Sequence, residues 1–150
     1  MKLQITTNML RALMWLAIVP LLVGCEQSRV DALMEELCQK DGGIKIYERV
    51  ILPKHLFNQY GTPLVFKGWD RLNEGYQFTW DTERIKKDKP TLTRYVYSVK
   101  RNEDKKLLGE YVVYMRIGGD LIWRPGPDSS KSCPTKANEI VFLKTIFIEE

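Results

Sequence analysis

The sequence predicts an α+β domain in which an N-terminal amphipathic helix packs on one face of a mainly antiparallel sheet. Apolar residues recur with the period of a helix over residues 28–41, and from residue 44 onward they recur mostly at every second position, as in strands. A cysteine in the helical segment, Cys38, and a late cysteine, Cys133, would join the helix to the sheet. The two periods and the cysteine pair together predict this fold.

The chain begins with the features of a secretory signal peptide. Lys2 and Arg11 give a positive start, residues 12–23 are almost entirely apolar, and small Gly24 precedes a cysteine. The segment Leu22-Val23-Gly24-Cys25 resembles the bacterial lipobox, in which the cysteine is acylated and becomes the new N-terminus.

We therefore expect a signal peptide, residues 1–24, to be removed and Cys25 to be lipidated, so that residues 25–150 form one membrane-tethered domain facing the periplasm. A transmembrane anchor is one alternative, but a spanning helix needs roughly 20 apolar residues, and this run is shorter and contains Pro20. A plain secreted protein is the other. Because aspartate after the cysteine is the usual inner-membrane retention signal in Gram-negative lipoproteins, Glu26 favours the outer membrane.

Length and charge fit a small single domain and give no sign of a nucleic-acid partner. Removing 24 residues from 150 leaves 126, which suits one domain with one core. The net charge is +4, from 23 basic and 19 acidic side chains, and without Lys2 and Arg11 it falls to +2. A nucleic-acid-binding protein concentrates basic residues on one face, so we expect no nucleic acid to bind. No motif implies a cofactor.

Residues 28–41 form the predicted helix. Ser28 is expected to cap it, with Asp31 three residues later as in a capping box, and Gly42-Gly43 to end it, because glycine tolerates the left-handed conformation at that position. Only two residues separate this helix from Cys25, so the domain is expected to lie close to the membrane. The predicted apolar face contains Val30, Leu33, Met34, Leu37 and Cys38.

The rest of the chain is predicted to form strands and turns. The strongest strand signals lie at residues 94–101 and 107–117, and the polar turn 102–106 between them predicts a hairpin. Further strands are predicted at 44–50, 76–80 and 121–123, and a long apolar strand at 140–148. The segments interpreted as loops or turns are 53–75, Gly118-Gly119-Asp120 and 125–134.

The three cysteines predict one disulfide. If Cys25 carries lipid, Cys38 and Cys133 remain in a compartment that permits disulfides, and we predict that they pair. In the chain-entropy model such a long loop stabilises the fold by roughly 4 to 5 kcal/mol. The alternative is two separate buried thiols. A metal site is not expected, because no ligand-spacing motif exists around the single histidine.

Candidate catalytic residues are few. His55 is the only histidine and lies near a loop, with no serine or cysteine nucleophile at a recognisable spacing. Tryptophan and tyrosine residues lie near four carboxylates, Asp70, Glu74, Asp81 and Glu83, as in the cleft of a carboxylate-dependent hydrolase. Because spacing in the sequence says little about separation in space, we assign no catalytic residue and do not expect an enzyme.

The aromatic residues of the strands suggest an interaction surface. If the helix covers only one sheet face, some of them must lie on the other, and exposed aromatic residues mark contact surfaces. By alternation Tyr114 and Arg116 face opposite to Tyr111, Val113 and Met115. We therefore hypothesise a partner-binding face that includes Tyr114 and Arg116.

Three segments resemble those of a group of small, functionally uncharacterised proteobacterial lipoproteins. They are residues 38–48, Gly118-Gly119-Asp120 and Ser132-Cys133-Pro134. The resemblance supports lipidation and the pairing of Cys38 with Cys133, because both cysteines lie in matching segments. It implies no substrate, cofactor or catalytic residue.

Together these features predict a membrane-tethered lipoprotein that acts as a non-catalytic binding module in the cell envelope. Its partners would be the membrane, through the lipid anchor, and an unidentified envelope protein. One alternative is an inhibitor or immunity lipoprotein that blocks a lysozyme or a periplasmic toxin. A carboxylate-dependent hydrolase is the less favoured alternative.

Overall fold

The computed structural model describes residues 26–65, 75–120 and 126–150. The signal peptide and Cys25 therefore lie outside the described residues, as does the strand expected at 121–123. The helices are the N-terminal helix (residues 26–41), the short 3-10 helix η1 (Lys54–Leu56) and α2 (Glu139–Ile146). The strands are β1 (Gly43–Ile46), β2 (Val50–Leu52), β3 (Tyr76–Lys86), β4 (Thr91–Arg101), β5 (Leu107–Ile117), β6 (Ser130–Cys133) and β7 (Phe147–Glu149). The predicted α+β class is confirmed.

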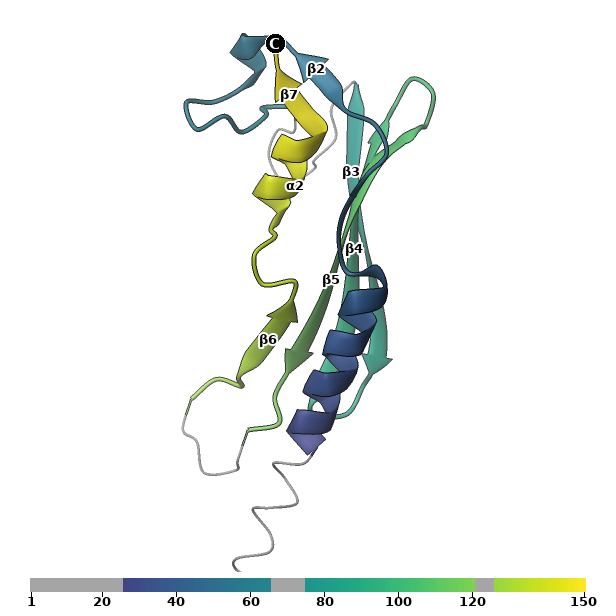
Figure 1. Cartoon of the computed structure of the whole chain (residues 1–150), viewed down its shortest axis with the longest axis vertical. Coiled ribbons are helices and arrows are strands. Elements are labelled where there is room, and N and C mark those ends of the chain that lie inside the picture. Colours follow the sequence, from purple (N-terminus) through teal and green to yellow (C-terminus); the bar gives the residue numbers. More distant parts are fainter. Residues whose placement is uncertain (1–25, 66–74, 121–125) are drawn as a thin grey trace, which may run out of the picture.

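Three long antiparallel strands, β3, β4 and β5, form the frame of the molecule (Figure 1). The strand order is β1-β5-β4-β3, and β6 also pairs with β5. β1 pairs with β5 residues 109–112 and β6 with residues 114–117, so two short strands lie end to end along one edge of β5. The predicted β4–β5 hairpin is confirmed, with Tyr97 opposite Tyr111.

The sheet carries a hydrophobic cluster on each face. The N-terminal helix covers one face, as predicted, while α2 and the parallel pair β2–β7 cover part of the other, near the C-terminus (Figure 1). The cluster under the N-terminal helix contains Val30, Met34, Cys38, Leu92, Val112 and Tyr114. The larger cluster contains Leu52, Val65, Phe78, Val99, Leu108, Tyr111, Val113, Phe142, Ile146 and Phe147.

The N-terminal helix differs from its prediction at its start and agrees at its end. It is already helical at residue 26, so Ser28 is not the N-cap. Leu33, expected on the apolar face, is 39% exposed. The helix ends at the two glycines: the Gly42 N–H donates to the Cys38 carbonyl at 2.8 Å, and Gly43 has a φ of +108°. This left-handed backbone favours glycine and turns the chain into β1.

The strand predicted at residues 140–148 is wrong, because most of this segment is the helix α2. The Asn138 side chain caps it by accepting a hydrogen bond from the Val141 N–H. Phe142 and Ile146 lie one turn apart and are fully buried, whereas Val141 is 43% exposed. Helical spacing thus buries the largest apolar side chains of the segment. Only the end of the segment is extended, as β7, which pairs in parallel with β2.

The loop predicted at residues 125–134 is wrong in its second half, where β6 pairs antiparallel with β5. β6 ends at Cys133, which forms the predicted disulfide with Cys38. The two Cα atoms are 6.0 Å apart and the residues are 95 positions apart in sequence. The disulfide therefore joins the N-terminal helix to a sheet strand, and not to a loop as expected.

Candidate functional site

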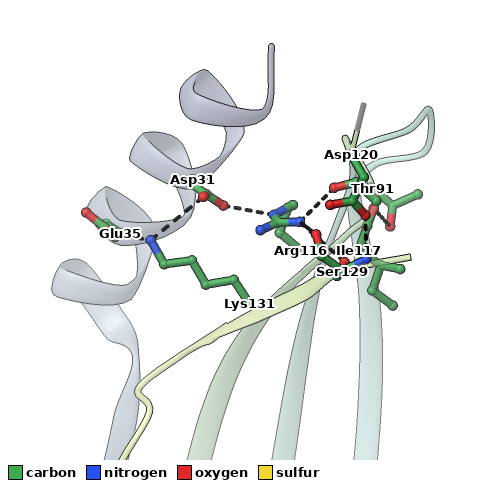
Figure 2. Close-up of polar contacts among 9 residues, drawn as sticks. Asp31, Glu35, Thr91, Arg116, Ile117, Asp120, Ser129 and Lys131 are labelled. Carbon is green, nitrogen blue, oxygen red and sulfur yellow. Dashed lines mark hydrogen bonds and ion pairs between the residues drawn. The ribbon is translucent and has the colours of Figure 1, made fainter. Parts of the chain in front are cut away.

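Arg116, in the second half of β5, is the centre of a buried polar cluster beneath the N-terminal helix (Figure 2). Its side chain is 4% exposed, and its Nε donates to Asp31 Oδ1 of the helix at 2.9 Å. Its Nη1 donates to the Gly118 carbonyl at 2.7 Å and to Ser129 Oγ at 2.8 Å. A buried charge needs such partners, since leaving it unpaired is strongly unfavourable.

The same cluster orders the turn that follows β5. In the amide orientation that satisfies both ends of the Gln27 side chain, the oxygen accepts from Arg116 Nη2 at 3.2 Å and the nitrogen donates to the Gly119 carbonyl at 2.9 Å. The Asp120 carboxylate accepts from the Ser129 N–H at 2.5 Å. Helix, strand and turn thus share one hydrogen-bond network, which holds the start of the helix on the sheet.

A groove runs between the N-terminal helix and β6, and Lys131 crosses it. Lys131 Nζ lies 2.7 Å from Glu35 Oε1 and 3.8 Å from Asp31 Oδ2. The hydrogen bond with Glu35 raises the pKa of the Lys131 ammonium above its ordinary value. Lys131 and Glu35 line both hollows of the groove, of about 400 and 360 Å³. The first hollow is also lined by Gln27, Ser28, Asp31 and Ala32, and the second by Met34, Ser132, Cys133, Pro134, Thr135 and Lys136.

A second polar cluster holds the end of the N-terminal helix. The Tyr114 hydroxyl donates to Asp41 Oδ1 at 2.5 Å, and Arg94 Nη2 donates to Asp41 Oδ2 at 2.7 Å. Burial alone would raise the pKa of Asp41, but the hydrogen bonds from Tyr114 and Arg94 outweigh it and hold the pKa below its ordinary value. Burial and the bond to Asp41 raise the pKa of Tyr114. The carboxylate and the neutral phenol therefore stabilise one another.

The hypothesis that Tyr114 and Arg116 belong to an exposed partner-binding face is wrong. The two residues are 3% and 4% exposed. Alternation does place them opposite Tyr111 and Val113, as predicted, but the N-terminal helix covers the face of Tyr114 and Arg116. They connect the helix to the sheet.

The other candidate residues are not brought together by the described part of the chain. Asp70 and Glu74 lie outside the described residues. Asp81 and Glu83 lie on the exposed part of β3, where Glu83 Oε2 is 3.9 Å from Arg94 Nη1. His55 is exposed in η1. Over the described ranges, no group of three or more His, Cys, Asp or Glu side chains is arranged to hold a metal ion.

The β2–β7 pair lies at the end of the molecule opposite the start of the N-terminal helix (Figure 1), and it exposes apolar side chains. Ile51 of β2 is 69% exposed and is paired with Ile148 of β7, which is 39% exposed. Their neighbours in the same strands, Leu52 and Phe147, are buried in the main core. This surface could not be predicted from the sequence, because the parallel β2–β7 pairing joins two three-residue strands that lie far apart along the chain.

Comparisons of the chain with protein-family models, with curated protein sequences and with solved structures gave no match. No helix in the described ranges is both long and apolar enough to cross a membrane.

Proposed function

We propose that this protein is a lipid-anchored component of the bacterial cell envelope, whose single domain faces the periplasm and acts by binding another envelope protein. One observation carries the anchoring part of the proposal. The lipobox-like segment ends at Cys25, and the chain is already helical at residue 26. The attachment point would therefore adjoin a folded element directly. A lipoprotein cysteine usually carries three acyl chains, and several chains together make dissociation from a membrane negligible.

The helix next to Cys25 is bonded to the sheet, so an anchor at Cys25 would hold the whole domain. Its first turns are joined to β5 by the ion pair of Asp31 with Arg116, and its last turn is joined to β6 by the disulfide of Cys38 with Cys133. Attachment at residue 25 would then restrain the sheet as well as the helix. This supports a domain held close to the membrane surface.

The apolar pair Ile51 and Ile148 supports binding as the mode of action. Exposed apolar side chains that lie side by side favour contact with another protein. They lie at the end opposite the start of the helix, so they would point away from the membrane. We propose that the partner is an envelope protein that presents an apolar contact surface to this end of the domain.

Lipidation is tested by labelling cells with an alkyne fatty acid and measuring the intact mass of the purified protein. We expect label and acyl mass on the wild-type chain, neither on Cys25→Ala, and accumulation of the uncleaved precursor in the presence of globomycin. A water-soluble mature protein with an unmodified Cys25 thiol would overturn the proposal.

Partner binding is tested by affinity purification from detergent-solubilised membranes. We expect the double variant Ile51→Lys with Ile148→Lys to lose a partner that the wild-type protein retains. Leu33→Lys is the matched control, because Leu33 is exposed to the same degree as Ile148 but lies on the N-terminal helix. Equal recovery of all co-purifying proteins with the three chains would contradict binding at this surface.

A further inference from the structure

The start of the N-terminal helix and the β3–β4 turn lie side by side at one end of the molecule (Figure 1). Lys86, the last residue of β3, has its Nζ 3.5 Å from Glu26 Oε1 of the helix. A Cβ built on Gly119 would lie 3.0 Å from Pro90 Cβ of the turn and 3.2 Å from Gln27 Cβ of the helix. We call this region, residues 26–29, 86–90 and 118–120, the anchor end.

The turn at the anchor end is rich in amines. Its sequence Lys86-Lys87-Asp88-Lys89 has three lysines and one aspartate. Lys86 Nζ donates to the Asp88 carbonyl at 2.9 Å, and Lys89 Nζ lies 2.7 Å from Asp128 Oδ2. Lys87 is exposed, and the described part of the chain places no carboxylate within ion-pair distance of it. A lysine ammonium is a compact charge that binds phosphate well.

The anchor end also lies next to the proposed attachment point. Cys25 directly precedes Glu26, and one residue of extended chain spans only about 3.5 Å. The acyl chains on Cys25 would therefore bring Glu26, and the Lys86 side chain that contacts it, close to the lipid headgroups. Any anionic headgroup at this surface would face the lysines of the turn.

We propose that the anchor end rests on the membrane and that Lys87, with Lys86 and Lys89, contacts the phosphate groups of anionic phospholipids. The long strands then stand away from the membrane, and the β2–β7 pair is outermost. This inference rests on the proposed lipid anchor. Because Glu26 and Asp128 offset part of the local positive charge, the contact depends on short-range amine–phosphate pairing and not on a large net charge.

The β4–β5 turn supplies an internal control. It lies at the opposite end of the sheet and carries Lys105, which is exposed like Lys87. The two amines therefore have similar access to solvent in the free protein. Only Lys87 would face the lipid once the protein is in a membrane.

The test uses the mature lipidated protein in neutral detergent and in vesicles that contain phosphatidylglycerol. A brief pulse of an amine-acylating reagent is followed by peptide mass spectrometry. We expect acylation of Lys87 to fall severalfold in the vesicles while acylation of Lys105 stays the same. Equal acylation of Lys87 and Lys105 in vesicles would overturn the inference.

Two further arms separate the headgroup contact from the anchor. Protection of Lys86 and Lys89 should be weaker for Lys87→Glu than for Lys105→Glu, and weaker on phosphatidylcholine vesicles than on phosphatidylglycerol vesicles. Equal protection in either comparison would overturn the amine–phosphate contact. Intact mass and vesicle flotation report the anchor separately: an unlipidated protein overturns both proposals, whereas a lipidated, floating protein with reactive Lys87 overturns only this one.

Discussion

Arg116 of β5 and Asp31 of the N-terminal helix form an ion pair in which the arginine side chain is 4% exposed and the aspartate side chain 22%. The pair joins the first turns of the helix to the second half of β5, on the same face as the disulfide. The two connections hold different parts of the helix, because Asp31 lies near its start and Cys38 near its end. The ion pair and the disulfide thereby attach the helix to the sheet near its two ends, in addition to the hydrogen bonds that Asp41 accepts from Tyr114 and Arg94.

Asp31→Asn should destabilise the protein strongly. The substitution leaves the buried Arg116 guanidinium without its charge partner, and removing one member of a buried ion pair costs about 3 kcal/mol or more. Urea unfolding under oxidising conditions measures the loss. The matched control is Glu36→Gln, which breaks the exposed pair of Glu36 with Lys40 on the same helix. A similar loss for both variants would contradict the importance of the buried pair.

The two cysteine substitutions should not be additive. Cys38→Ser or Cys133→Ser alone removes the disulfide, which stabilises a loop of this length by roughly 4 to 5 kcal/mol in the chain-entropy model. The double variant should lose no more than either single variant, because the bond is shared. Unfolding free energies of the three variants test this. Losses that add up would show that each cysteine contributes separately.

Gly42→Ala should destabilise the end of the N-terminal helix. Its Cβ would lie 2.6 Å from the Cys38 carbonyl oxygen and 2.7 Å from Cys38 Sγ, so both the helix end and the disulfide would have to shift. Overpacking of this kind costs about 1 to 3 kcal/mol. Gly75→Ala is the control, because its Cβ meets no atom within 4 Å. The free energies of unfolding of both variants are measured by chemical denaturation. Equal values would contradict the predicted clash at Gly42.

Stability should fall in acid through Asp41. Because the pKa of Asp41 in the folded protein lies below its ordinary value of 3.8, its ionised form adds stability above about pH 4. This contribution is lost as the pH falls through the lower pKa of the folded state. The stability difference between wild type and Asp41→Asn, measured by urea unfolding, should therefore shrink in acid. Tyr114→Phe removes one of the hydrogen bonds that lower the pKa of Asp41, so it should reduce the loss of stability that Asp41→Asn causes. A loss of stability that does not change with pH would contradict the prediction.

The secondary structure was predicted correctly where a segment showed a single periodicity. Alternation from Arg94 to Ile117 predicted the β4–β5 hairpin, and the two glycines after Asp41 predicted where the N-terminal helix ends. The cysteine count predicted the disulfide once Cys25 was assigned to lipid. These features depend on local patterns or on simple pairing, which a single sequence contains.

Prediction was wrong where tertiary contacts decided between two local possibilities. The run from Ile140 to Ile148 is rich in residues that favour strands, yet burial of Phe142 and Ile146 on one side makes most of it helical. Alternation separated Tyr114 from Tyr111 correctly, but it could not tell which face the N-terminal helix would cover. The partners of Arg116 come from the helix and from a turn, so no spacing in the sequence indicated them.

The placement of β1 and β6 along one edge of β5 has a consequence for biogenesis. That edge is completed by segments from both halves of the chain, and β6 begins only 20 residues before the last residue. In a nascent or truncated chain that stops before Ser130, the half of this edge that β6 covers has no pairing strand, and Cys38 lacks its disulfide partner Cys133. The sheet edge and the disulfide can therefore form only after β6 has been synthesised.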